Sequence, residues 1–273
     1  MHFAWWIGAF FEFYIHITLG KKMTITEMFD LSGKTALVTG SSRGIGKAIA
    51  MAYGLAGAKV VFHGSRPSDK LDAAVEEAKQ AGIVCEKAIC DLANEAETKA
   101  FAASMDVPDI LVLNASMQTY MGFEDFTTEE YEKEYSANVK ANFILLQRAL
   151  PVMKERNFGR IIGISSVNHY RPGLNLAIYA STKSSLMNMM INIARSYGRF
   201  GITANTISPG IIATDRNAKV LSDPKMVENF INWVPTHRIG AADDIAGSAL
   251  LLAAPCGSYI TGIDIPVTGG LHL

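Results

Sequence analysis

The sequence predicts one α/β domain in which a central parallel sheet of about seven strands carries helices on both faces, the doubly wound arrangement. From Leu31 onward, short runs rich in β-branched residues alternate with longer helical patterns, which is typical of parallel strands joined by helices. No segment rich in proline, glycine or serine divides the 273 residues, and 49% of them are hydrophobic. This composition is sufficient for a large buried core. We therefore expect one domain over residues 31–273.

The alternation places each expected element along the chain. Thr127 followed by Glu130 has the spacing of a capping box and is expected to open the longest helix. Strands are predicted at residues 35–39, 59–63, 84–89, 110–114, 159–164, 203–207 and 264–268, and helices at residues 46–57, 69–82, 94–104, 127–155 and 179–198.

The segment TGSSRGIG (residues 39–46) ends the first predicted strand and runs into the first helix. In an open parallel sheet, ligands bind beyond the carboxyl ends of the strands, and the N–H groups of a helix start favour a pyrophosphate. Gly40, Gly44 and Gly46 would permit a tight turn and bring bare backbone close to the phosphates. The spacing differs from the commoner GxGxxG fingerprint, so a turn that only packs the helix on the strand is the alternative.

The stretch after the second predicted strand favours NADP over NAD as the cofactor. NAD enzymes usually place there a carboxylate that binds the ribose 2′-hydroxyl, but this sequence has no acid before Asp69. Arg66 lies in this stretch, and Arg43 lies inside the glycine-rich turn. Two guanidinium groups would bind a ribose 2′-phosphate through charge-assisted hydrogen bonds. Two solvated surface arginines are the structural alternative.

Tyr179 and Lys183 form a candidate chemical centre, because they lie on one face at the start of a predicted helix. A nearby cation, either Lys183 or a nicotinamide ring, would lower the tyrosine pKa from about 10. Ser166 ends the fifth predicted strand and would polarise a carbonyl, with Ser165 as its rival. Asn138 lies inside the long helix, where its amide is expected to hold a water that connects Lys183 to solvent. Each of these residues taken singly also has an ordinary structural explanation.

In combination, these pieces make the chain resemble the short-chain dehydrogenase/reductase family from about residue 31 to residue 273. LNAS departs from the family's usual NNAG, because Ser116 stands where a glycine lies beside the cofactor. Within the family, the chain is similar to 3-oxoacyl-[acyl-carrier-protein] reductases and to gluconate 5-dehydrogenases. The motifs that carry the resemblance are, in order, TGSSRGIG, Asp91-Leu92 in CDLAN, LNAS (113–116), NVKANF (138–143), ISS with YASTK, SPGIIAT (208–214) and YITGIDIPVTGG (259–270).

The resemblance implies a Rossmann-type domain that transfers hydride between NADP(H) and a carbonyl or a secondary alcohol, with NAD as the second choice of cofactor. It implies a catalytic set of Asn138, Ser166, Tyr179 and Lys183, in which Tyr179 is the acid/base. The cofactor contacts, taken from the motifs and from the two arginines, are Gly40, Ser42, Arg43, Gly44, Ile45, Gly46, Arg66, Asp91, Leu92, Asn114, Ala115, Tyr179, Lys183, Pro209, Gly210, Ile212 and Thr214.

Two other functions stay open: a dinucleotide-binding sensor or scaffold without turnover, and an NAD-dependent dehydrogenase of sugar acids or hydroxysteroids. A substrate lid is expected at residues 214–238. Its cations Arg216, Lys219, His237 and Arg238 are placed to meet an anion, although a solvated helix face is the simpler explanation of each.

Composition argues against several classes of protein. The formal net charge is -1 with no basic block, so no nucleic-acid partner is expected. The three cysteines are widely spaced and form no metal motif, which indicates reduced thiols in a cytoplasmic protein without a metal site. The family resemblance further implies a homo-oligomer, either a dimer or a tetramer.

Residues 1–30 are expected to be an apolar N-terminal extension outside the fold. The stretch MHFAWWIGAFFEFYIHITLGKK lacks the charged start and the cleavage site of a signal peptide, and Glu12 interrupts it as a membrane span. Met23 is an alternative start of the protein. A membrane or interfacial anchor formed by residues 1–22 is the competing interpretation.

Overall fold

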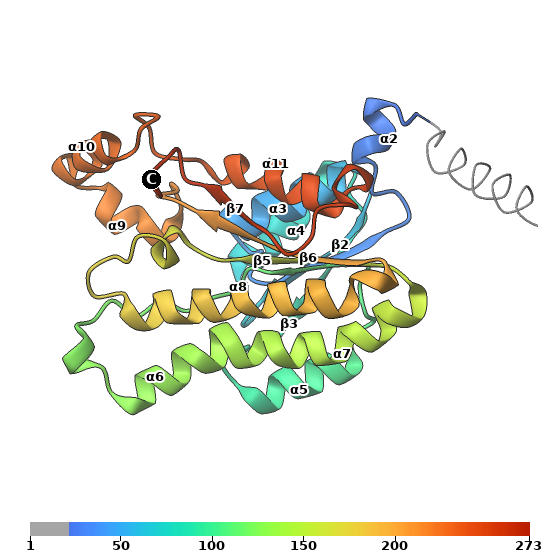
Figure 1. Cartoon of the computed structure of the whole chain (residues 1–273), viewed down its shortest axis with the longest axis horizontal. Helices are drawn as coiled ribbons and strands as arrows, with labels where there is room; N and C mark the ends of the chain where they lie inside the picture. Colours follow the sequence, from blue (N-terminus) through green and yellow to red (C-terminus); the bar gives the residue numbers. More distant parts are fainter. Residues whose placement is uncertain (1–21) are drawn as a thin grey trace, which may run out of the picture.

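The computed structural model describes residues 22–273; most of the predicted N-terminal extension, residues 1–21, lies outside the described residues. Within the described part, seven parallel strands form one sheet in the order β3-β2-β1-β4-β5-β6-β7 (Figure 1). The prediction of a single doubly wound α/β domain is confirmed. The strands are β1 (Thr35–Val38), β2 (Lys59–Gly64), β3 (Cys85–Ile89), β4 (Ile110–Leu113), β5 (Gly159–Ile164), β6 (Ile202–Pro209) and β7 (Asp264–Val267).

Helices cover both faces of this sheet (Figure 1). One hydrophobic core lies between the sheet and helices α3, α4 and α11, and a second lies between the sheet and helices α5, α7 and α8. The helices are α2 (Ile25–Phe29), α3 (Gly44–Leu55), α4 (Asp69–Gln80), α5 (Glu95–Ser104), α6 (Thr128–Tyr135), α7 (Ala141–Arg156), α8 (Ala177–Tyr197), α9 (Ala218–Leu221), α10 (Pro224–Trp233) and α11 (Ala242–Ala253).

The central strands are apolar along their whole length because helices cover both of their faces. Every residue of β4 and of β5 is buried. Strand order reverses between β1 and β4: the chain runs outward from β1 through β2 to β3, then returns to pair β4 with the other side of β1. A reversal of this kind opens a crevice at the carboxyl ends of the strands.

The helix predicted at residues 127–155 is present as an unbroken helical segment over residues 128–156, and it contains one π-helical turn that was not predicted. The capping box between Thr127 and Glu130 is present and opens α6. A π-helical turn, η2 (Ser136–Lys140), then separates α6 from α7. One extra residue in this turn rotates the side chains that follow, and such turns often lie at functional sites. Asn138 is in the middle of it.

The segment predicted as a lid contains the short turn η5 (Asp215–Asn217) and helices α9 and α10. These helices lie beyond the carboxyl ends of the strands, at one end of the molecule (Figure 1). The next helix, α11, was not predicted, and it packs directly on α3 on the same face of the sheet. At the N-terminal side, Thr24 and Glu27 form a capping box that opens α2.

Candidate active site

The glycine-rich turn joins β1 to α3 at the crevice. Gly40 (φ 65°) and Gly44 (φ 56°) adopt left-handed backbone conformations that favour glycine. A Cβ on Gly46 would lie 2.5 Å from the carbonyl oxygen of Gly40, so the third glycine is required by close packing. The N-cap residue of α3 is Arg43, which makes no side-chain capping bond. The first N–H groups of this helix are therefore available to an anion, which fits a dinucleotide pyrophosphate.

Asn114, a predicted cofactor contact, holds this turn in place. Its side-chain Nδ2 donates to the carbonyl oxygens of Thr39 (2.8 Å) and Gly40 (3.1 Å). The hydroxyl of Thr39 accepts in return from the N–H groups of Asn114 and Ala115. The loop after β4 is thus bonded directly to the glycine turn.

His63 also supports the turn, although no motif in the sequence distinguishes it. It is buried at the end of β2, where its Nδ1 accepts a hydrogen bond of 3.1 Å from the N–H of Gly40. Burial lowers the pKa of His63 to about 4, so the ring is neutral at pH 7 and can accept this bond. Asp91, another predicted cofactor residue, acts on it in the opposite direction and raises its pKa.

Tyr179, Lys183 and Ser166 converge at the carboxyl end of β5. The Lys183 ammonium is buried and donates to the carbonyl oxygen of Ile164 (2.8 Å), 5.5 Å from the centre of the Tyr179 ring. The hydroxyl of Ser166 accepts from the backbone and side chain of Asn168. Its rival Ser165 instead directs its hydroxyl to the carbonyl oxygen of Lys183 (3.3 Å).

The electrostatics of Tyr179 differ from the expectation. Burial raises the pKa of its phenol, and the largest opposing influence is the Arg216 guanidinium, followed by hydrogen bonding to Ser166 and Ser116. Lys183, the cation expected to lower the Tyr179 pKa, is not among the groups that shift it. Burial lowers the pKa of Lys183 itself to about 7, which halves the average charge of the ammonium near neutrality.

Asn138 is buried in the π-helical turn and bonds to the loop after β4. Its Oδ1 accepts from the N–H of Met117 (2.7 Å), and its Nδ2 donates to the carbonyl oxygen of Met117 (2.8 Å) and to the hydroxyl of Thr182 (3.1 Å). Both amide hydrogens therefore bind protein groups. The expected role of this amide in holding a water rests on its oxygen alone.

Glu134 is a buried carboxylate of this site that sequence reasoning missed. It is fully covered at the end of α6, where its Oε2 accepts from the N–H of Thr119 (3.1 Å) and its Oε1 has no hydrogen-bond partner. Burial raises the pKa of Glu134, and the cations of Lys183 and Arg216 lower it. In the sequence it stands among other glutamates of a polar helix, so no pattern distinguishes it.

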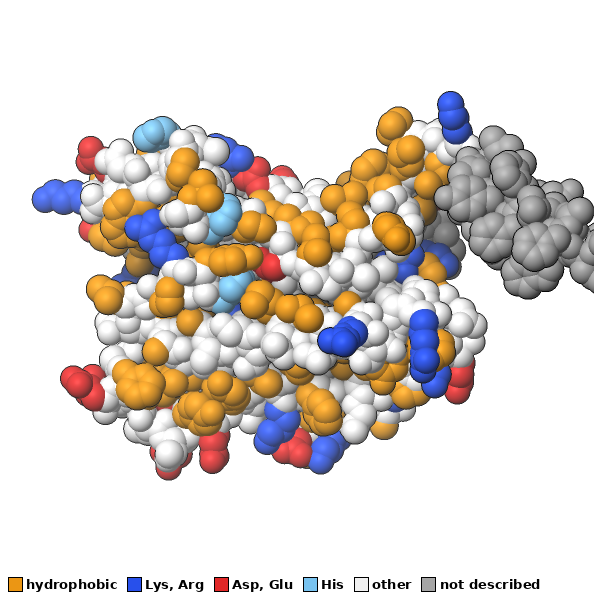
Figure 2. Space-filling model, in the orientation of Figure 1, with side chains coloured by type: hydrophobic (Ala, Val, Ile, Leu, Met, Phe, Trp, Pro, Cys, Tyr) orange, Lys and Arg blue, Asp and Glu red, His pale blue; other side chains and the backbone are white. Residues whose placement is uncertain are grey.

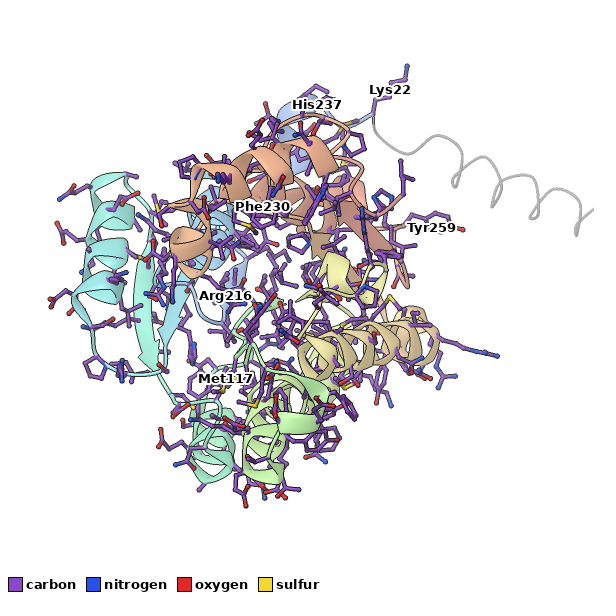
Figure 3. All side chains as sticks on the ribbon, turned by 90° about the vertical axis from the view of Figure 1, so that its left-hand side faces the viewer. Lys22, Met117, Arg216, Phe230, His237 and Tyr259 are labelled. Carbon is purple, nitrogen blue, oxygen red and sulfur yellow. The ribbon has the colours of Figure 1, made fainter. Side chains whose placement is uncertain are left out.

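Two neighbouring residues of the predicted lid, Asp215 and Arg216, bond to different parts of the crevice. Asp215 forms ion pairs with Lys70 of α4 and with Arg43, whose guanidinium nitrogen lies 3.6 Å from the carboxylate. Arg216 instead donates to the hydroxyl and to the carbonyl oxygen of Ser116, in the loop after β4. Figure 3 shows Arg216 between Phe230 of α10 and Met117 of that loop.

The remaining predicted cofactor residues lie around the same crevice. Thr214 approaches the glycine turn, because a Cβ on Gly44 would lie 3.4 Å from its Cγ2. Gly210 packs on Thr268, whose Cα would lie 2.8 Å from an added Cβ. Buried Ile212 pairs with Gly240. The other residues predicted there are Ser42 and Ile45 in the glycine turn and first helix, Arg66 after β2, Leu92 after β3, and Pro209 at the end of β6.

Comparisons with known proteins agree with this arrangement. A family model described as enoyl-(acyl carrier protein) reductase matches residues 40–272. The 3-oxoacyl-[acyl-carrier-protein] reductase FabG of Rickettsia felis is 34% identical over 248 residues, which cover 89% of this chain and 99% of the relative. The chain belongs to the short-chain dehydrogenase/reductase family. The resemblance noted in the motifs is confirmed, and with it the prediction of an oxidoreductase acting on carbonyl or alcohol groups.

Other members of the family are about as similar. Gluconate 5-dehydrogenase of Gluconobacter oxydans is 31% identical over 255 residues, covering 91% of this chain and 98% of the relative. The crystal structure of a 3-oxoacyl (acyl-carrier-protein) reductase from Agrobacterium tumefaciens C58 with NADP bound has a TM-score of 0.87 and 33% identity, and covers 92% of this chain and 99% of that one. These identities show the family to which the chain belongs. They do not distinguish among the substrates of its members, because relatives with different names are about equally similar.

Metal clusters and membrane-spanning helices were two further features to consider in the described part of the chain. Across residues 22–273, no cluster of three or more histidine, cysteine, aspartate or glutamate side chains is arranged to hold a metal ion. No helix in this part of the chain is long and apolar enough to span a membrane.

Proposed function

We propose that the protein transfers hydride between NADP(H) and a carbonyl or secondary alcohol carbon, with Tyr179 as the acid/base. The observation that carries this proposal is the convergence of Tyr179, Lys183 and Ser166 at the same edge of the sheet as the glycine turn. A phenol, a hydroxyl and a buried ammonium beside a phosphate-binding turn suit proton transfer coupled to hydride transfer.

Three features support NADP as the cofactor. The solved 3-oxoacyl (acyl-carrier-protein) reductase from Agrobacterium tumefaciens C58, with a TM-score of 0.87, carries NADP. Strand β2 ends at Gly64, with no carboxylate that would repel a 2′-phosphate. Arg43 and Lys70, which both pair with Asp215, lie beside the glycine turn and would bind phosphate oxygens. Arg66 stays a predicted ligand of the same phosphate.

The dinucleotide would supply the hydride, and the protein's own residues would manage the proton. In carbonyl reduction, Tyr179 donates its proton to the carbonyl oxygen; its raised pKa keeps the phenol protonated and ready for this step. The Ser166 hydroxyl hydrogen-bonds the same oxygen as negative charge develops on it. In alcohol oxidation the steps reverse, and Arg216 and Ser166 stabilise the phenolate.

Lys183 and Asn138 have supporting roles in this proposal. The Lys183 ammonium is fixed by the carbonyl oxygen of Ile164, and a pKa of about 7 suits it to exchange protons near neutrality. Its expected contact is the nicotinamide ribose. Asn138 positions the loop after β4 through its two bonds to Met117.

Substitution of Tyr179 by phenylalanine tests the proposal. We expect loss of NADPH-dependent carbonyl reduction by about 10²–10⁴-fold, the usual contribution of a positioned acid. Dinucleotide binding, measured by fluorescence titration, should change little. Tyr259→Phe is the matched control, because that side chain is fully exposed. Near-normal turnover by Tyr179→Phe would refute the assignment.

The same measurements separate the other two candidate functions. A sensor or scaffold would bind NADPH without oxidising it in the presence of any ketone tested. An NAD-dependent sugar-acid or hydroxysteroid dehydrogenase would use NADH in preference to NADPH across the same panel.

We also propose a homo-oligomer formed through the helices on one face of the sheet. Figure 2 shows hydrophobic side chains at several points over α6, α7 and α8. On these helices, Tyr131 of α6 is 41% exposed, Phe143 of α7 52% and Ile191 of α8 43%. Light scattering would distinguish a monomer from the expected dimer or tetramer. A cytoplasmic location and an N-terminal extension outside the fold stay predictions.

A further inference from the structure

The four cations of the predicted lid, Arg216, Lys219, His237 and Arg238, differ in their bonding partners in the structure. Arg238 is paired with Asp244 through two hydrogen bonds of 2.6 and 2.8 Å. His237 has a left-handed backbone (φ 49°) in an exposed turn. The side chain of Lys219 has no hydrogen bond or ion pair within residues 22–273. Arg216 alone reaches the crevice, where it binds Ser116.

Ser116 links this guanidinium to the catalytic phenol. The Ser116 hydroxyl accepts from both terminal nitrogens of Arg216, each at 3.1 Å. Hydrogen bonding to the same Ser116 hydroxyl influences Tyr179, and Arg216 is the strongest cation acting on that phenol. An exposed guanidinium is therefore linked through Ser116 to the phenol that would protonate the substrate carbonyl.

Arg216 keeps its charge and part of its hydrogen-bonding capacity. A guanidinium has about five N–H donors, and the contacts to Ser116 use three of them. In the described part of the chain, no carboxylate forms an ion pair with Arg216. Glu134 attracts it from a distance, but that carboxylate is buried and binds the N–H of Thr119.

The Arg216 guanidinium is exposed, is held by the hydroxyl and the carbonyl oxygen of Ser116, and has no carboxylate partner among residues 22–273. Arginine is the residue best suited to bind a planar carboxylate through two parallel N–H groups. Resting on the proposed function, we propose that Arg216 binds a carboxylate that the substrate carries close to its reacting carbonyl. The substrate class is then an oxo acid, or in the reverse direction a hydroxy acid.

The position of Arg216 argues against two other anions as its main ligand. The phosphate of a pantetheine-linked acyl thioester lies at the far end of a long flexible arm, well away from the reacting ketone. The phosphates of a dinucleotide are expected at the glycine turn, where Arg43 and Lys70 supply cations. Arg216 instead faces the side of the crevice that holds Tyr179 and Ser116.

Paired substrates test this inference directly. NADPH oxidation is measured with pyruvate, 3-oxobutanoate and 4-oxopentanoate, each compared with its methyl ester. The esters keep the carbonyl and remove the charge, and the three acids vary the distance between carbonyl and carboxylate. We expect the full-length protein to prefer at least one acid over its ester by about 10-fold or more in kcat/KM, as one charge-assisted contact provides.

Three variants assign that preference to Arg216. Arg216→Gln should lower kcat/KM for the preferred acid by about 10- to 100-fold more than it lowers kcat/KM for the ester, because both substrates lose the cation that acts on Tyr179 and only the acid loses a contact of its own. Arg216→Lys should retain part of the preference, because it keeps the charge without the planar fork. Lys219→Gln removes a lid cation that does not reach the crevice and should behave as the wild type.

Several results would overturn the inference. An equal loss for acid and ester in Arg216→Gln would mean that the arginine acts only on Tyr179. A selective rise in the KM for NADPH would assign Arg216 to the cofactor. Turnover of the esters without preference for any acid would show that the substrate is not an oxo acid, and it would still agree with the proposed function. Loss of every carbonyl reduction, neutral ketones included, would instead refute the proposed function.

Discussion

Replacing Asn138 with alanine would test whether this residue anchors the active-site loop or serves the proton path. The change removes the two bonds to the backbone of Met117 and the bond to Thr182. At about 1 kcal/mol for each hydrogen bond, the loss is about 3 kcal/mol, and the better helix propensity of alanine returns about 0.5 kcal/mol. We expect a net destabilisation of about 2–3 kcal/mol.

This loss is large enough to measure by thermal unfolding. For a domain of this size, 1 kcal/mol corresponds to about 2–4 °C in Tm, so the variant should unfold about 5–10 °C below the wild type. Asn192→Ala is the matched control, because that amide is exposed and bonds only to Asn188 within its own helix. It should shift Tm by no more than about 2 °C.

Activity then separates the two roles. If the residue is an anchor, turnover of Asn138→Ala should fall together with stability, and binding of NADPH should restore part of both. Retention of the wild-type Tm with a selective loss of turnover would refute the anchor argument. It would return Asn138 to the proton path that the sequence suggested.

Three further predictions follow from the same geometry. Gly46→Ala should destabilise the protein by about 1–3 kcal/mol and weaken NADPH binding, because the new Cβ would lie 2.5 Å from the carbonyl oxygen of Gly40; unchanged NADPH titration would contradict this. Asp215→Asn should lower the KM for NADPH, because it frees Arg43 and Lys70 from their ion pairs, whereas a raised KM would show that Asp215 positions them productively. Lys183 should make stability rise with pH: the unfolded chain keeps this proton up to about pH 10.4 and the folded protein only to about 7, so between these values the unfolded state binds more protons. The free energy of unfolding of the wild type should therefore increase relative to that of Lys183→Met between pH 7 and 9. Parallel plots of unfolding free energy against pH for the two proteins would contradict this prediction.

The fold could be predicted because strand and helix periodicities alternate over the whole domain. The strands at the centre of the sheet are continuous apolar runs, and all seven predicted strands match observed ones to within two residues at either end. Helix α11 was missed for a physical reason. Its sequence, ADDIAGSALLLA, is rich in small and apolar residues, which suit its close packing on α3. The sequence therefore lacks the clear polar face by which an amphipathic helix is predicted.

The side chain at the centre of the π-helical turn η2 makes contacts that are distant in the chain. The Asn138 amide binds Met117, 21 residues earlier, and Thr182, 44 residues later. A local pattern cannot register either partner, so residues 127–155 have the sequence of one helix. The same limit applies to Glu134 and His63, which are polar in sequence and buried only through tertiary packing.

The departure noted at LNAS has a structural counterpart that sequence alone could not supply. Ser116 adds a hydroxyl where the family usually has a glycine, and this hydroxyl accepts from Arg216, 100 residues later. The two residues therefore form one unit across the crevice. Read singly, the serine is a steric complication and the arginine is a solvated lid charge.

Asp215 and Arg216, at the start of the predicted lid, lie between the proposed cofactor region and the proposed substrate region of the crevice. Asp215 is tied by charge to Arg43 and Lys70 on the side of the glycine turn, while the adjacent Arg216 is tied to Ser116 on the side of Tyr179. A cofactor phosphate would compete with Asp215 for its cations, and a substrate carboxylate would compete with Ser116 for the guanidinium. Because the two residues are consecutive, breaking the ion pairs of Asp215 changes how firmly Arg216 is held, and breaking the bonds of Arg216 to Ser116 changes how firmly Asp215 is held. Binding of NADPH should therefore alter the affinity for an oxo acid, and by thermodynamic reciprocity the acid should alter the affinity for NADPH by the same factor.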